Sequence, residues 1–354
     1  MTAPIRTRVL KGFDDPTFGP AEWDELSSGG DTVYLTWQWQ RSWWHTWGDG
    51  QLLLIVAERD GKIAALAPLF ARSGMVYFVG TGFESNYLDF IGDISDPHVL
   101  DAILERARRS VPDFAGFQFY FVADSSGTAQ RLHESAARLN LCCYDEDETM
   151  LAPILDIAGQ PEVALAIANH KRTQKYERVF RRDGTLEVHH YRDAKTILSY
   201  LPEFFEQHRA RWAGVDNPSR FEYPQTRALF EEFTHCAANT GWLRFTRLEW
   251  NGRSIAFHYG ILYRGRFFWG PASFALDVAR RSPGQVLIRR LLLATIDEGA
   301  RTFDFGTGSQ EFKVRVTTHM NSVHDWGLYP AETRLRAADN GRAAAVFQTP
   351  ETNL

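Results

Sequence analysis

Apolar and polar positions alternate in two stretches of the chain that share one layout. Each stretch contains two strands joined by a tight turn and followed by a third strand. The expected strands fall at residues 52–58, 63–70 and 75–79 in the first half, and at 243–249, 254–262 and 266–270 in the second. The turns are Asp60-Gly61 and Asn251-Gly252, which favour type I′ geometry because both central positions need a positive φ.

The segments around these strands also correspond. Helical periodicity predicts helices at residues 20–26, 37–47 and 97–109, and again at 194–212, 224–238 and 283–298. Short strands are expected at residues 7–10, 117–122, 185–191 and 302–305. Both halves therefore follow the order strand, two helices, three antiparallel strands, helix, strand.

This repeated order predicts an α+β fold with two tandem domains, each a mixed, mainly antiparallel sheet flanked by helices. The expected boundaries are residues 1–160 and 161–335, followed by a polar tail at 336–354. The length of 354 residues agrees with about two domains. A long polar helix at residues 163–182 is expected to join the halves.

Composition narrows the class of protein. Lys and Arg number 39 and Asp and Glu 44, so the net charge is −5, which argues against a protein that mainly coats nucleic acid. No stretch approaches the roughly 20 apolar residues of a membrane span, and residues 1–15 lack the apolar core of a secretory signal. The three cysteines form no CxxC pair, so neither a disulfide framework nor a metal site is expected and a cytoplasmic location is predicted.

Six basic residues gather on the expected linking helix. They are Lys171, Arg172, Lys175, Arg178, Arg181 and Arg182. They are typical of a solvated helix face, and the alternative is the basic rim of a site for a phosphorylated ligand or RNA.

The start of the helix expected at residue 283 is a candidate anion site. Its residues are Arg280, Arg281, Ser282, Pro283, Gly284 and Gln285. Ser282 suits the N-cap, Pro283 suits the first turn, and free N–H groups with nearby arginines would bind phosphate or pyrophosphate. The alternative is an ordinary capped helix with solvated arginines.

The corresponding helix start in the first half has the opposite charge. Asp93 and Asp96 lie where an anion would bind, and no arginine is near in the sequence. Acidic residues stabilise a helix start but repel pyrophosphate. The first domain is therefore expected to be a degenerate copy, used as a scaffold or for acceptor binding.

Three further residues are candidates for catalysis. Asp304 ends a short strand before a glycine turn and could act in acid–base chemistry or cap the turn. Lys313 could bind an acceptor carboxylate or cofactor phosphates, or pair with Glu311. His258 lies on the face of its strand that otherwise carries small residues, where it could accept a proton or be a hydrogen-bonded structural histidine.

These residues and the order of elements resemble the GNAT acyltransferase superfamily. Two such units in tandem resemble its CelD/BcsL type, which is related to the Fem peptidyltransferases. The stretches that carry the resemblance are residues 252–258, the segment from Asp277 to Gly284 and residues 299–313, with weaker matches at Trp43-Trp44, 67–70 and 86–90.

The resemblance implies transfer of an acetyl or longer acyl group from acyl-CoA to an amine on a small-molecule, sugar or peptide precursor, with a link to exopolysaccharide biosynthesis. Pantetheine would insert between the strands that end near Gly270 and Phe305, and the pyrophosphate would meet residues 281–285. No covalent enzyme intermediate and no metal are implied.

Two departures from the family pattern keep alternatives open. The loop at residues 280–285 has fewer glycines than usual, and Phe312 replaces a tyrosine that would protonate the leaving thiolate. The Phe312-Lys313 pair resembles the pair in Fem proteins. That resemblance implies aminoacyl-tRNA as the donor for this chain, with RNA bound through residues 171–182. A non-catalytic module that binds a carbohydrate precursor or a partner protein is the third hypothesis.

Overall fold

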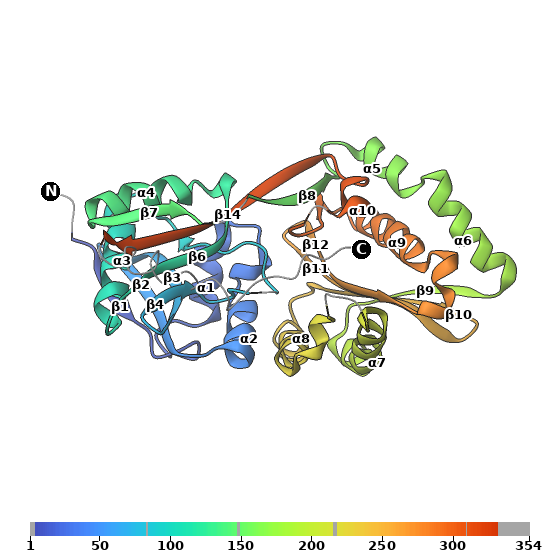
Figure 1. Cartoon of the computed structure of the whole chain (residues 1–354), viewed down its shortest axis with the longest axis horizontal. Helices are drawn as coiled ribbons and strands as arrows, with labels where there is room; N and C mark the ends of the chain where they lie inside the picture. The colour runs from blue at the N-terminus through green and yellow to red at the C-terminus, as the bar shows by residue number, and fades with distance from the viewer. Residues whose placement is uncertain (1–3, 83, 147–148, 215–217, 309, 332–354) are drawn as a thin grey trace. The chain divides into compact units, whose positions relative to one another are not determined.

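The computed structural model describes residues 4–331 except 83, 147–148, 215–217 and 309. These residues form two compact units (Figure 1). Unit 1 contains the described residues up to Met150 and those from Asn321 onward, and unit 2 contains Leu151 to Met320. The expected polar tail at residues 336–354 lies outside the described part of the chain.

Unit 1 is a mixed sheet with helices packed on it. Its strands are β1 (Arg6–Val9), β2 (Gln51–Arg59), β3 (Lys62–Arg72), β4 (Met75–Phe78), β5 (Ile91–Gly92), β6 (Gly116–Ala123), β7 (Leu141–Asp145) and most of β14 (His319–Pro330). They follow the order β1-β2-β3-β4-β6-β14, with β5 beside β3 and β7 beside β14. The helices are α1 (Pro20–Leu26), α2 (Trp37–Trp47), α3 (Pro97–Ser110) and α4 (Thr128–Arg138).

Unit 2 repeats this plan. Its strands follow the order β8 (Met150–Asp156), β13 (Thr302–Asp304), β12 (Arg266–Phe274), β11 (Arg253–Tyr263), β10 (Leu243–Trp250) and β9 (Leu186–Tyr191). Its helices are α5 (Pro161–Ala168), α6 (Lys171–Asp183), α7 (Ala194–Trp212), α8 (Pro224–Cys236), α9 (Pro283–Asp297) and α10 (Glu311–Val314). The predicted α+β class with a mixed, mainly antiparallel sheet is confirmed.

Two layers of apolar side chains hold the sheet of unit 2 between its helices. Phe204 of α7 lies 5.8 Å from Phe245 and 5.9 Å from Phe257, measured between ring centroids, on one face. On the other face, Ala256 of β11 and Leu291 of α9 belong to a second buried cluster. Figure 1 shows α7 and α8 on one side of β9–β12 and α5, α6 and α9 on the other.

The two predicted type I′ turns are present. Asp60 and Gly61 have φ of 51° and 73°, and Asn251 and Gly252 have φ of 53° and 78°. These positive values are the reason for Asp-Gly and Asn-Gly at the hairpin tips. The local turn signal therefore located both hairpins.

Two strands lie in a different unit from the one that the expected boundary at residue 160 assigns. From Leu151 onward β8 belongs to unit 2, where it pairs with β13, and from Asn321 onward β14 belongs to unit 1, where it pairs with β6 and β7. The partners of β14 in β6 are about 200 residues away in sequence, as with Val323 and Ala123. No local pattern reports such a pairing.

The long helix expected at residues 163–182 is wrong in its continuity. The helix is interrupted between α5 and α6, where the His170 side chain accepts a hydrogen bond from the N–H of Arg172 and caps α6.

Of the helices in the described ranges, none is long and apolar enough to cross a membrane.

Candidate functional site

Strands β12 and β13 of unit 2 separate after a short parallel pairing. Arg266, Phe267 and Phe268 pair with residues 302–304. Beyond that point β12 stays paired with β11 as far as Phe274, whereas Phe305 and Gly308 donate hydrogen bonds to β8. The outer edge of β12 from Gly270 to Phe274 receives no backbone hydrogen bond from the residues that the structure describes.

Helix α9 begins next to this open edge. A Cβ atom at Gly284 would lie 3.4 Å from the ring of Phe274, the last residue of β12. Ser282 occupies the N-cap position but is left-handed, with φ 58° and ψ 54°, and its side chain accepts no capping hydrogen bond. The predicted capping role of the Ser282 hydroxyl is therefore wrong, and instead that hydroxyl interacts with Tyr176 of α6.

The two arginines of the candidate anion site point to different surroundings. Arg281 forms an ion pair with Asp183 at 2.6 Å and lies over the ring of Trp250 at 5.0 Å. Arg280 is exposed. Hydrogen bonds from Arg182 and then from Arg281 hold the pKa of Asp183 well below its usual range. The positive charge at this helix start is therefore partly neutralised by α6.

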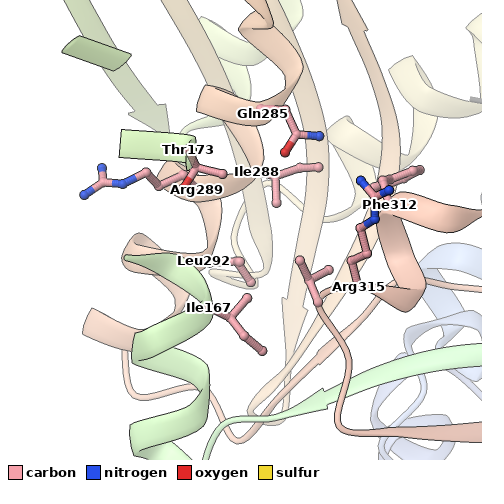
Figure 2. Close-up of a pocket in the computed structure, with 9 residues that line it drawn as sticks. Ile167, Thr173, Gln285, Ile288, Arg289, Leu292, Phe312 and Arg315 are labelled. Carbon is pink, nitrogen blue, oxygen red and sulfur yellow. The ribbon is translucent and has the colours of Figure 1, made fainter. Parts of the chain in front are cut away.

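Gln285 lines a small pocket that also contains Phe312 (Figure 2). In Figure 2, Gln285, Ile288 and Leu292 of α9 face Phe312 and Arg315 across this pocket. Its volume of about 50 Å³ is near that of one or two water molecules. It cannot hold a nucleotide, but it shows that the predicted anion site and the Phe312-Lys313 pair are neighbours.

Lys313 is a buried cation close to the open edge. Its side chain is 7% exposed, and Nζ donates a hydrogen bond to the carbonyl oxygen of Thr307 at 2.8 Å. Burial lowers the pKa of Lys313 to about 7, although the charge of Asp304 opposes this shift. The expected alternative of a pair with Glu311 is wrong, because Glu311 pairs with Arg315.

Asp304 is fully buried and its two carboxylate oxygens have different partners. One oxygen accepts hydrogen bonds from the Arg266 guanidinium at 2.6 and 2.9 Å, and the other accepts the N–H of Gly306 at 2.7 Å. The second contact caps the turn, which is one of the two roles expected for Asp304. The ion pair with Arg266 was missed, because it joins residues 38 positions apart.

His258 lies on the α9 side of the sheet and is fully buried. Its ring lies 4.4 Å from that of Trp269 and 5.8 Å from that of Phe267. Neither ring nitrogen has a hydrogen-bond partner among the described residues, so the alternative of a hydrogen-bonded structural histidine is not observed. Burial lowers the pKa of His258 to about 3, which makes the imidazole neutral at physiological pH.

The structure brings the three catalytic candidates to one place. Trp269 lies between His258 and Phe312, and its ring is 6.0 Å from that of Phe312. The Asp304 carboxylate lies close enough to Lys313 to oppose the lowering of its pKa. Lys313 is the candidate whose pKa lies near neutrality. It could accept a proton from an amine and return it to a leaving group.

Unit 1 differs at the corresponding helix start. Asp96 accepts the N–H of His98 at 2.8 Å and caps α3, as an acidic residue should. Asp96 also forms an ion pair with Arg59, so the expectation of no nearby arginine is wrong in three dimensions. The negative charge of Asp96 is therefore paired with groups of unit 1 itself.

Comparison with known proteins tests the fold. Residues 168–314, less than half of the chain, match the family described as acetyltransferase (GNAT) domain. A crystal structure of FemX is 11% identical with a TM-score of 0.65, covering 90% of this chain and 98% of FemX. A tandem GNAT protein from the clavulanic acid biosynthesis pathway is 11% identical with a TM-score of 0.53, covering 92% of this chain and 99% of that protein.

A third similar structure is L-PGS from Bacillus licheniformis, at 13% identity and a TM-score of 0.56, covering 94% of this chain and 96% of that one. No curated protein matches the sequence. Identities this low establish the fold alone. The chain therefore has a tandem GNAT-like fold, and residues 168–314 match the GNAT acetyltransferase domain.

Proposed function

We propose that the protein is an acyl-CoA-dependent N-acyltransferase of the CelD/BcsL type, with its active site in unit 2. The observation that carries this proposal is the open edge of β12 between the start of α9 and the buried Lys313. A pantetheine arm needs such an unpaired strand edge for its amide groups. The start of α9, with residues 280–285, is where the phosphates would lie.

The reaction needs one group that moves a proton. The neutral amine of Lys313 accepts a proton from the acceptor amine as its nitrogen attacks the thioester carbonyl. The carbon–sulfur bond then breaks, and the Lys313 ammonium returns the proton to the thiolate, which leaves as free CoA. A pKa of about 7 suits both steps at neutral pH.

Asp304 and His258 then have supporting roles. The Asp304 carboxylate, fixed by Arg266 and Gly306, shapes the turn that carries Thr307, whose carbonyl holds Lys313. The ring of His258 packs against the ring of Trp269 and helps to hold it in place. The acceptor is an amine on a small-molecule, sugar or peptide precursor, and a role in polysaccharide biosynthesis is part of the proposal.

Thermal unfolding with CoA, acetyl-CoA and a long-chain acyl-CoA tests the donor. A ligand at about 100 times its dissociation constant stabilises the fold by about 2.7 kcal/mol, which is a shift of several degrees. Gly284→Glu should abolish that shift, because it adds a carboxylate at the start of α9. The matched control is His98→Glu, at the start of α3 in unit 1, which should leave the shift unchanged.

Release of free thiol from the bound thioester with a panel of amines then tests the reaction. A shift with no turnover for any amine would favour a non-catalytic binding module. Absence of a shift with every thioester would contradict the acyl-CoA proposal.

One observation favours aminoacyl-tRNA as an alternative donor. Lys171, Lys175 and Arg178 are exposed on α6, whereas Arg181 and Arg182 pair with Glu177 and Asp183. Under this alternative, tRNA binding should weaken steeply as salt rises. Filter binding with the triple Gln variant of the three exposed cations would show a smaller salt slope, and an unchanged slope would exclude this surface.

A further inference from the structure

The open edge of β12 has a nearby cation, Arg211, that no sequence motif singles out. Arg211 lies near the end of α7, a helix on the side of the sheet opposite α9. Its Nη1 donates a hydrogen bond to the carbonyl oxygen of Ala272 at 3.2 Å. Its guanidinium carbon lies 4.0 Å from the centre of the Phe274 ring.

The direction of the Ala272 carbonyl places Arg211 at the unpaired side of β12. Ala275 donates its N–H to Ile255 of β11, and backbone groups of successive residues in a strand point to opposite neighbours. Residues 273 and 275 therefore face β11, and Ala272 faces away from it. Arg211 thus reaches around the edge that β13 leaves open, and its guanidinium lies on Phe274, next to Gly284 of α9.

Arg211 is also a charge without a counter-charge. No carboxylate of the described residues forms an ion pair with it, in contrast to Arg209, which pairs with Glu206 and Glu222. Burial lowers the pKa of Arg211 to about 10, and no opposite charge offsets that effect. The neighbouring Trp212 has a buried indole N–H with no acceptor among the described residues.

We propose that Arg211 is a binding residue of the same site, and that it holds a phosphate group of the substrate against the start of α9. A guanidinium has a planar set of donors that fits phosphate, and the N–H groups of a helix start favour the same charge. Arg281 is engaged by Asp183, so Arg211 supplies the cation that Arg281 does not. This inference rests on the proposed function for the location of the site.

The phosphate could belong to the nucleotide end of CoA or to a phosphorylated acceptor. Calorimetric titration of the full chain with inorganic pyrophosphate tests the shared chemistry. Arg211→Met should weaken binding at least tenfold, Arg211→Lys should weaken it less, and the control Arg209→Met should bind as the wild type does. Competition by CoA would assign the group to the donor, and its absence would assign it to the acceptor.

Several results would overturn the proposal. They are equal pyrophosphate affinity in the wild type and Arg211→Met, no pyrophosphate binding by the wild type, or Arg211-dependent binding of succinate in place of pyrophosphate. If Arg211→Met did not fold, Arg211→Gln would replace it, with the same expected loss of at least tenfold in pyrophosphate affinity.

Failure of this inference is distinguishable from failure of the proposed function. Thioester turnover with an unchanged KM in Arg211→Met would leave the acyltransferase standing and remove Arg211 from its site. Arg211-dependent pyrophosphate binding without thioester turnover would have the opposite meaning.

Discussion

The two units have the same pair of parallel strands and use it differently. In unit 1, residues 75–77 of β4 pair with residues 116–118 of β6, and in unit 2, residues 266–268 of β12 pair with residues 302–304 of β13. In both units the strands then separate. The two units differ in the groups that lie beside these strands after they separate.

In unit 1 the chain fills this space itself. Leu88 donates its N–H to the carbonyl oxygen of Phe121 in β6, and the ring of Phe90 lies 5.1 Å from Phe78 and 5.6 Å from Phe119. In unit 2 the corresponding edge of β12 faces the side chain of Arg211. One backbone plan thus gives a closed core in one unit and an accessible edge with titratable groups in the other.

The largest effect should come from Lys313 of unit 2. Lys313→Met should lower acyl transfer by a factor of about 10² to 10⁴, because the proton carrier is lost. In the wild type the rate should rise as pH increases through about 7, since the neutral amine is the active form. Thiol release measured from pH 5.5 to 9 checks both.

The exposed Lys195 of α7 provides the control for that measurement, and Lys195→Met should behave as the wild type does. A Lys313→Met enzyme with undiminished turnover would remove Lys313 from the mechanism.

The strand-end ion pair should be the next largest difference between the units. Asp304→Ala removes the buried carboxylate that pairs with the largely buried Arg266 guanidinium, which should cost about 3 to 5 kcal/mol of unfolding free energy. Gln118 occupies the corresponding position in β6, and Gln118→Ala should cost about 0.5 kcal/mol or less. Urea unfolding of both variants makes the comparison, and equal losses would contradict it.

Opening the filled space in unit 1 should affect stability alone. Phe90→Ala removes a ring that is 5% exposed and should cost about 3 kcal/mol. The thermal shift caused by acyl-CoA should stay the same, because the proposed site lies in unit 2. If Phe90→Ala abolished ligand binding in a folded protein, the assignment of the site to unit 2 would be wrong.

The smallest expected effect is an opposite dependence of the two units on pH. Burial raises the pKa of Asp89 in unit 1 to about 6, so its contribution to stability is present below pH 4 and is lost as pH rises through 6. Burial lowers the pKa of Lys313 to about 7, so stability rises with pH above 7, where the unfolded chain holds the extra proton.

Between pH 5 and 9 the change in unfolding free energy should be roughly 1 kcal/mol for Asp89 and roughly 2 to 3 kcal/mol for Lys313. Denaturant unfolding across that range, with Asp89→Asn and Lys313→Met, assigns the slopes. A slope that survives its own substitution would show that another group titrates.

Local signals in the sequence determined most of the elements. The Asp60-Gly61 and Asn251-Gly252 turns, the alternation beside them and the helical periodicity all report on neighbours within a few residues, which fix backbone conformation. The repeat followed from them, and so did the GNAT-like expectation. The proximity of Lys313 to the helix start of α9 was available only through the resemblance.

Tertiary structure decided which charges are free to act. Arg281 was the stronger candidate in sequence, yet Asp183 neutralises it, whereas Arg211 looked like an ordinary helix residue and lies at the open edge without a carboxylate. The placement of β8 and β14 was likewise decided by pairing between distant segments. Ion pairs and strand pairing depend on distance in space, and a linear pattern carries no record of that distance.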